Sequence, residues 1–175
     1  MISAFDIFKI GIGPSSSHTV GPMRAGKTFC EELAQKDLLE RTTRVGADVY
    51  GSLSLTGHGH HTDQAILLGL EGFLPDTVPL ERIPSIIEGI GKTGRLLLNG
   101  EREVEFPKDS GMVFHPEFLA LHENGMRLRA WAGEELLFER TYYSIGGGFI
   151  VDEEHFHDQP KEEVRVPYPY KTAAE

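Results

Sequence analysis

The sequence of 175 residues contains a single cysteine, Cys30. One thiol cannot form an internal disulfide, so the fold is not stabilised by disulfide bonds within the chain. This composition is typical of a protein in a reducing compartment. The chain also cannot build a zinc ribbon or an all-cysteine iron–sulfur site, because each needs several thiolates. A chain of this length should bury roughly 70% of the surface it exposes when unfolded, so a core can form without such staples.

Basic residues are also scarce, with 17 Lys and Arg against 27 Asp and Glu and a net charge of −10. A duplex-binding protein needs a basic stripe to neutralise phosphates, so we expect no nucleic-acid partner. No stretch approaches the roughly 18 apolar residues of a membrane span, and residues 1–10 lack the layout of a signal peptide. We therefore expect an acidic, soluble, cytoplasmic protein without a membrane partner.

The first half of the sequence predicts two helices. Apolar residues recur at three- and four-residue spacing over residues 22–36, which predicts an amphipathic helix. The apolar residues of 62–73 predict a second helix, which Gly72 and Pro75 end. Between them, alternation of apolar and polar residues over 45–57 predicts a strand.

The second half is rich in hairpin signals. Asn-Gly pairs at 99–100 and 124–125 are the strongest short hairpin signal that a sequence offers. The strands expected from them and from later alternation cover residues 95–98, 101–106, 119–122, 126–131, 136–143 and 149–151. Helices followed by hairpins predict an α+β domain, with helices packed on an antiparallel or mixed sheet.

We place this domain at residues 1–151. Residues 152–175 are acidic and contain three prolines before residue 170, so we expect a linker there. The last residues, 171–175, resemble the start of a helix that does not continue, which suggests that the chain is a fragment of a longer protein.

Residues 11–19, Gly-Ile-Gly-Pro-Ser-Ser-Ser-His-Thr, form a polar loop in front of the first predicted helix. Hydroxyls and free backbone N–H groups beside a helix start favour a carboxylate or a phosphate. We expect an anion pocket there, formed by Ser15, Ser16, Ser17 and Thr19. The alternative is a flexible polar linker, although a proline and a histidine within the serine run are unlike one.

Three histidines and an aspartate occupy residues 58–63, at the junction of a predicted strand and helix. Such a set can supply a base, an anion contact or metal ligands. The metallohydrolase pattern His-x-His-x-Asp-His fails by one residue, because Thr62 and Asp63 stand where it needs Asp and His. Another metal arrangement stays open, and so does a helix N-cap role for Asp63.

Residues 21–28 match the phosphate-loop pattern G-x-x-x-x-G-K-[ST] in full. That pattern is meaningful only between a buried strand and a helix, and here a polar loop precedes it. Pro22 would also remove a backbone donor from the phosphate cradle. We therefore assign the match to chance and do not expect a nucleotide hydrolase.

Several short segments together resemble one family: 13–19 (GPSSSHT), 21–23 (GPM), 50–53 (YGSL), 57–59 (GHG), 61–63 (HTD), 144–149 (SIGGGF) and 166–170 (VPYPY). They are similar to the N-terminal signature of the bacterial iron–sulfur-dependent L-serine dehydratases, or L-serine ammonia-lyases. The resemblance covers nearly the whole chain.

This resemblance implies the β domain of a single-chain enzyme whose catalytic α domain is missing here. It also implies a fold similar to the regulatory substrate-binding domain of some phosphoglycerate dehydrogenases. The implied reaction converts L-serine to pyruvate and ammonia without pyridoxal phosphate. The reaction uses a [4Fe–4S] cluster as a Lewis acid. The cysteines that bind this cluster lie in the α domain. A homodimer is implied as well.

In that reaction, His61 is the candidate base for the Cα proton, because imidazole transfers protons near neutral pH. Asp63 would orient His61 or cap the helix, and His18 would bind the carboxylate or share the proton transfer. We expect no metal ligand on this chain. Two alternatives stay open: a base supplied by the absent domain, and a regulatory module that binds serine or another small carboxylate for a different catalytic partner.

Overall fold

A computed structural model describes residue 13 and residues 15–158 of the chain. The sequence also predicts a short helical turn at residues 4–8. This turn, the end of the predicted linker and the helix start at 171–175 lie outside these residues. The boundary between domain and linker at residue 151 therefore stays a prediction.

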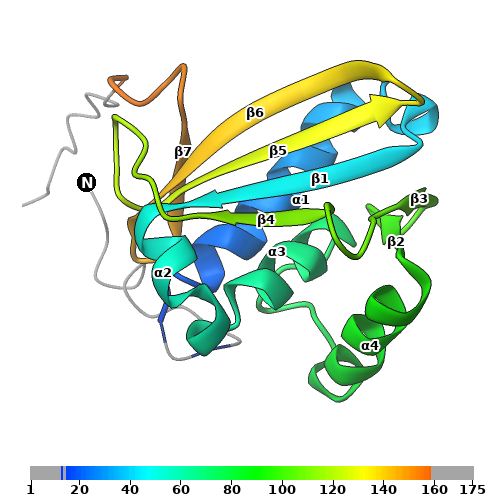
Figure 1. Cartoon of the computed structure of the whole chain (residues 1–175), viewed down its shortest axis with the longest axis horizontal. Helices are drawn as coiled ribbons and strands as arrows, with labels where there is room; N and C mark the ends of the chain where they lie inside the picture. Colours follow the sequence, from blue (N-terminus) through cyan, green and yellow to red (C-terminus); the bar gives the residue numbers. More distant parts are fainter. Residues whose placement is uncertain (1–12, 14, 159–175) are drawn as a thin grey trace, which may run out of the picture.

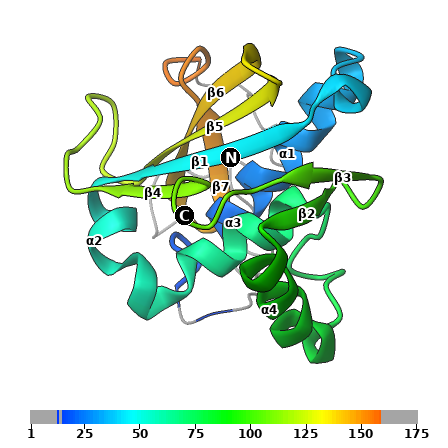
Figure 2. The ribbon, with the colours of Figure 1, turned by 45° about the vertical axis from the view of Figure 1, so that its right-hand side comes forward.

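The described chain forms two layers, a mixed sheet with the helices gathered on one of its faces (Figures 1 and 2). This arrangement confirms the expected α+β class. The elements in chain order are α1 (Val20–Gln35), η2 (Leu39–Arg41), β1 (Arg44–Tyr50), α2 (Gly51–His60), α3 (Thr62–Leu70), η3 (Leu80–Arg82), α4 (Ile83–Thr93), β2 (Arg95–Leu98), β3 (Arg102–Glu105), β4 (Met112–His115), β5 (Gly125–Ala132), β6 (Glu135–Gly146) and β7 (Phe149–Asp152).

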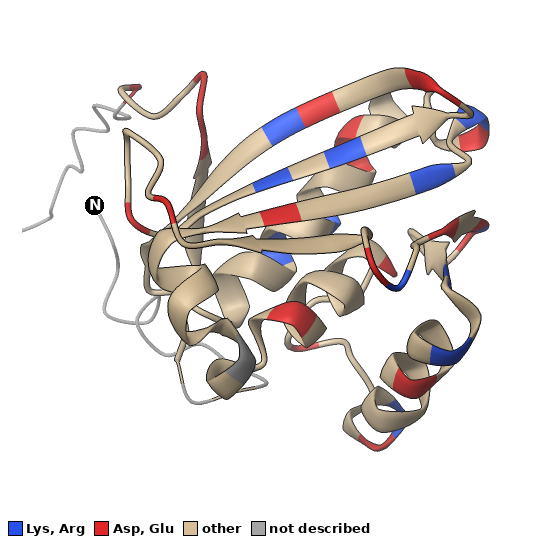
Figure 3. Cartoon of the chain, viewed as in Figure 1, with Lys and Arg blue, Asp and Glu red and all other residues tan. Residues whose placement is uncertain are grey.

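The sheet has the strand order β2-β3-β1-β5-β6-β7, and β4 pairs with β1 on the same edge as β3. β1 runs antiparallel to β5 and parallel to β3 and β4. Because side chains alternate across a strand, Val45, Ala47 and Val49 of β1 face the helices and are buried. Arg44 and Asp48 lie on the other face, and Figure 3 shows charged residues along β1, β5 and β6.

The helix layer depends on a close crossing of α1 and α3. A Cβ added at Gly69 would lie 2.1 Å from the Met23 carbonyl oxygen, and one at Gly26 would lie 2.8 Å from the Ile66 carbonyl oxygen. The two backbones can therefore touch only because both positions lack a side chain. Gly26 is thus an interior packing residue of α1, which agrees with our rejection of the phosphate-loop match.

Three sequence predictions are confirmed with small shifts in their boundaries. Helices predicted at 22–36 and 62–73 appear as α1 and α3, and the first Asn-Gly hairpin appears as β2 and β3. Asn99 and Gly100 both have positive φ, 55° and 73°, as a type I′ turn requires.

The strand predicted over 45–57 is wrong beyond Tyr50, because residues 51–60 form α2. Gly51 has φ +55° and turns the chain out of the sheet. Leu53 is fully buried while Leu55 is 64% exposed. In a strand these two side chains would share a face, so the alternation that suggested a strand arose by chance.

The second predicted hairpin is also wrong, because residues 119–122 form no strand. β5 pairs instead with β1 and β6. Asn124 is buried, and its side-chain amide donates to the Ser144 carbonyl at 3.2 Å, so it connects two segments instead of making a hairpin turn. β4 was missed, because its four residues show no clear alternation.

None of the helices in the described part of the chain is long and apolar enough to cross a membrane.

Candidate functional site

Three segments that lie far apart in the sequence meet where α1 begins. The Thr62 hydroxyl, at the start of α3, donates to the His18 carbonyl at 2.8 Å. The Ser144 hydroxyl, near the end of β6, donates to the Ser17 carbonyl at 2.7 Å. The serine loop (residues 15–19), the histidine segment (residues 57–63) and the glycine-rich end of β6 therefore form one cluster, beside α2 in Figure 1.

A missing side chain on α1 allows this convergence. A Cβ at Gly21 would lie 2.0 Å from the Ser144 hydroxyl oxygen. Glycine at this position lets β6 approach the first turn of α1. The segment that resembles a phosphate loop therefore serves to pack α1 against β6.

The serine loop is wound into turns that run into α1. The backbone N–H groups of His18 and Thr19 both donate to the Ser15 carbonyl, at 3.2 and 3.0 Å. The Thr19 hydroxyl donates to the same carbonyl at 2.7 Å, and Thr19 is fully buried. Ser16 is exposed, whereas Ser15 and Ser17 are half-buried.

These positions divide the four expected anion-binding residues. Ser15, Ser16 and Ser17 lie where a ligand can reach their hydroxyls, and their role stays a prediction. The Thr19 hydroxyl faces inward and already has an acceptor, so in this conformation it stabilises the loop. A contact from Thr19 to a bound anion would require the loop to open.

His18 links the serine loop to α2. Its Nδ1 lies 2.9 Å from the Ser17 hydroxyl and 3.3 Å from the Ser15 hydroxyl. Its Nε2 lies 3.2 Å from the Ser52 hydroxyl. Burial lowers the pKa of His18, and the nearby His60, with ring centroids 5.0 Å apart, lowers it further. A neutral imidazole is therefore favoured at position 18.

His61 occupies the break between α2 and α3. Its backbone is in the left-handed region, with φ 60° and ψ 33°, and its side chain is exposed. Left-handed backbone is uncommon for non-glycine residues, although histidine, asparagine and aspartate tolerate it better than most. The side chain makes no hydrogen bond to any residue that the structure describes, so the imidazole is free to meet a ligand.

Asp63 lies in the first turn of α3 but caps no backbone N–H, so the N-cap interpretation is not supported. Its Oδ1 atom is buried and has no hydrogen-bond partner among the described residues. No hydrogen bond joins Asp63 to His61, so an orienting role for Asp63 stays a prediction.

Sequence reasoning missed two hydroxyls of this cluster, those of Ser52 and Ser144. Both lie inside segments that carry the family resemblance, 50–53 and 144–149, which was the only signal available. Neither belongs to a local pattern that would mark it as part of a site, because each acts on a residue far away along the chain.

Outside this cluster, Asp152, Glu154 and His155 form the one group with metal-ligand potential in the described part of the chain. His155 Nδ1 lies 2.8 Å from both Asp152 carboxylate oxygens. Arg140 binds Glu154 at 2.7 Å. These ligand atoms already have partners of opposite charge, so their charges are compensated within the described part of the chain.

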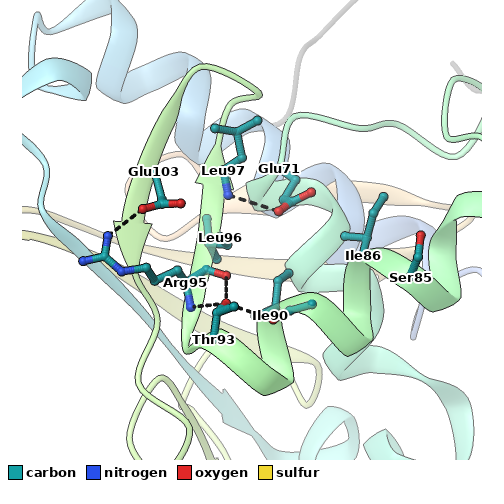
Figure 4. A pocket seen from close by; sticks show the side chains of 10 residues that line it. Glu71, Ser85, Ile86, Ile90, Thr93, Arg95, Leu96, Leu97 and Glu103 are labelled. Carbon is teal, nitrogen blue, oxygen red and sulfur yellow. Dashed lines mark hydrogen bonds and ion pairs between the residues drawn. The ribbon is translucent and has the colours of Figure 1, made fainter.

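A cavity of about 270 Å³ lies between α4 and β2 (Figure 4). The Glu71 carboxylate on its wall accepts the Leu97 N–H at 3.0 Å, and Arg95 binds Glu103 at 2.6 Å. The Thr93 hydroxyl donates to the Gly89 carbonyl. Each of these polar groups already has a hydrogen-bond partner that supports the edge of β2, so this cavity is not our candidate site.

Comparison with known proteins shows the family of the chain. The family model described as "Serine dehydratase beta chain" matches residues 3–155. L-serine dehydratase 2 of Escherichia coli K12 is 64% identical over 100% of this chain, and L-serine dehydratase 1 of the same strain is 60% identical. L-serine dehydratase of Haemophilus influenzae is 54% identical over 99% of this chain.

The chain spans 38–39% of the length of these relatives. Every described segment of the cluster lies within the residues that the family model matches. The chain therefore belongs to the family of serine dehydratase beta chains.

Proposed function

We propose that this chain is the β domain of an L-serine ammonia-lyase and that it supplies substrate-binding and proton-transfer residues to a site shared with a catalytic α domain. The observation that carries the proposal is the junction of the serine loop with the α2–α3 break, sealed by the Thr62–His18 hydrogen bond of 2.8 Å. This junction brings the serine loop beside the segment that carries the exposed His61, and it does so in a chain of the serine dehydratase family.

The serine loop binds the carboxylate of L-serine through the hydroxyls of Ser15, Ser16 and Ser17. His18, held neutral by its lowered pKa, donates a hydrogen bond to that carboxylate or shares in proton transfer. His61 removes the Cα proton as the β-hydroxyl leaves, which gives aminoacrylate and water. The aminoacrylate tautomerises to an imine, and water hydrolyses the imine to pyruvate and ammonia.

A [4Fe–4S] cluster does not fit the residues of this chain. Its only cysteine, Cys30, is fully buried and donates its thiol hydrogen to the Leu70 carbonyl at 3.2 Å. Burial raises the pKa of this thiol to about 12, whereas an iron ligand must be a thiolate. We therefore assign the ligands of the [4Fe–4S] cluster to the α domain. A homodimer in the cytoplasm completes the proposal.

The test uses the full-length enzyme with His61→Ala and His61→Asn. Asparagine tolerates the left-handed backbone of position 61, so the second variant removes the imidazole and keeps the fold. Both should lower turnover by roughly two to four orders of magnitude, as expected for loss of a general base. Solvent exchange of the serine Cα proton should fall in parallel, while the absorbance of the [4Fe–4S] cluster stays unchanged.

His157→Ala serves as the matched control, because His157 is exposed and lies outside the serine loop and the histidine segment. The turnover of this variant should be unchanged. Near-normal turnover in both His61 variants would overturn the assignment, and His18 would be the next residue to substitute. A module that only senses serine would instead change the serine concentration needed for activity and leave Cα exchange at saturation intact.

A further inference from the structure

We propose a second anion site on this chain, centred on Arg24 and outside the serine loop. A cavity of about 260 Å³ is lined by residues of two elements and one loop. Arg24, Lys27, Thr28 and Glu31 come from α1, Leu74 follows α3, and Ile150 lies in β7. The ligand class is a small oxyanion, a phosphate or a short carboxylate.

The four α1 residues share one side of the helix, because residues three and four apart are neighbours on a helix surface. Ala25, Phe29 and Leu33 of the same helix belong to the buried core. The cavity therefore lies on the polar side of α1, and Leu74 and Ile150 give it apolar walls.

Arg24 is the feature that points to a ligand. Its Nε atom is buried and has no hydrogen-bond partner. No residue that the structure describes makes a hydrogen bond or ion pair with this guanidinium. By contrast, Arg129 binds Asp48 and Glu139, and Arg140 binds Glu32 and Glu154.

The missing partner of Arg24 is an oxyanion, because a buried donor needs an acceptor and a guanidinium matches carboxylate and phosphate with two parallel hydrogen bonds. The second cation of the cavity, Lys27, already donates to Asn99 Oδ1 at 3.0 Å and lies 3.6 Å from Glu31 Oε1. Arg24 thus carries the uncompensated positive charge, and Thr28 adds a hydroxyl donor.

The size of the cavity sets the size of the ligand. Pockets for drug-sized molecules occupy about 300–1,000 Å³, and this cavity is just below that range. The cavity of Figure 4 has almost the same volume, but its Glu71 carboxylate and its Arg95 guanidinium each have a hydrogen-bond partner within the fold. An unpaired buried donor is what separates a binding site from a packing defect here.

The test is an NMR titration of the 175-residue chain with inorganic phosphate and, separately, with acetate, each at constant ionic strength. We expect saturable shifts of the backbone amides of residues 24–28 and 150, with midpoints in the millimolar range. Tighter binding of phosphate than of acetate would identify a phosphate site, and the reverse order a carboxylate site.

Arg24→Gln should abolish the shifts. Arg24→Lys keeps the charge but loses the planar pair of N–H donors, so it should weaken binding about tenfold. Arg82→Gln, at an exposed arginine of η3, should bind as the parent chain does. If Arg24→Gln fails to fold, two other measurements test the site. The shifts of the parent chain must centre on residues 24–28, and Thr28→Val must weaken anion binding.

The proposal fails if neither anion gives saturable shifts, or if Arg24→Gln binds like the parent chain. It also fails if the shifts are confined to residues 15–19. That last result would leave the serine loop of the proposed function intact and remove only the Arg24 site, so the two proposals can fail separately.

Discussion

The two faces of the sheet present opposite chemistry from the same strands. On the helix-covered face, Val49 of β1 and Leu128 of β5 are fully buried in the core. On the open face, Arg129 of β5 bridges Asp48 of β1 and Glu139 of β6. Close packing therefore governs the stability of the covered side, whereas ion pairs govern the open side, and water screens those ion pairs that are exposed.

The largest effect should come from Gly69→Ala on the covered side. The new Cβ would lie 2.1 Å from a backbone oxygen of α1, so the two helices must separate. We expect a loss of about 3 kcal/mol in the free energy of unfolding, measured by urea denaturation.

The matched control is Gly89→Ala, in the interior of α4, where an added Cβ meets no atom within 4 Å. It should raise the free energy of unfolding by about 0.5–1 kcal/mol through helix propensity. Equal effects at the two glycines would refute the view that backbone contact controls the covered side.

A smaller effect is expected for Asp48→Asn on the open face. Asp48 is 8% exposed and accepts hydrogen bonds from Arg129 at 2.5 Å and from His115 at 2.6 Å. Loss of its charge should cost about 2 kcal/mol, because hydrogen bonds to charged groups contribute about 1.5–3 kcal/mol.

Glu139→Gln sharpens this result, since the Glu139 side chain binds the same arginine but is 40% exposed. It should cost under about 1 kcal/mol in the same denaturation experiment. A larger loss for Glu139→Gln than for Asp48→Asn would mean that burial does not set the strength of the network.

The pH dependence of stability tests the cluster at the end of the sheet. Burial lowers the pKa of His18 below 6.5, so the unfolded chain takes up this proton first as the pH falls. Stability should therefore decrease as the pH drops below about 6.5, and the contribution of His18 should vanish above that pH.

His18→Gln should flatten this part of the profile, as measured by unfolding free energies at pH 8, 7, 6 and 5.5. His155 has the opposite effect on the pH dependence of stability, because its hydrogen bond to Asp152 raises its pKa. Only the difference between parent and variant isolates His18. An unchanged slope in His18→Gln would show that this histidine is not held neutral.

The smallest effect should come from Lys92→Ala on α4. Lys92 and Glu88 form an i,i+4 pair at 2.5 Å, but their side chains are 72% and 64% exposed. Such a pair stabilises by about 0.2–0.5 kcal/mol and less at high salt. A loss above 1 kcal/mol at 1 M salt would contradict the screening that we assign to exposed charges.

Local sequence patterns predicted the elements whose apolar residues repeat over several turns or flank a clear hairpin signal, namely α1, α3 and the β2–β3 hairpin. They failed at α2, where the turn set by Gly51 and the burial of Leu53 decide between helix and strand. They also failed at residues 119–122, because the neighbours of β5 come from distant parts of the chain.

The candidate site was predicted as separate motifs, and its assembly was not. Nothing local indicates that Thr62 reaches the His18 carbonyl or that Ser144 reaches Ser17, since the partners are 44 and 127 residues apart. The inward position of Thr19 was missed for the same reason, because it depends on what packs against the loop.

The Ser144–Ser17 hydrogen bond also has a consequence for how the protein folds. It closes a loop of 127 residues, and such long-range contacts form slowly because ordering the intervening chain costs entropy. We expect α1 and the β5–β6 hairpin to form early and the serine loop to become ordered only when they dock. In a nascent chain, the serine loop should then become ordered only after residue 144 has left the ribosome.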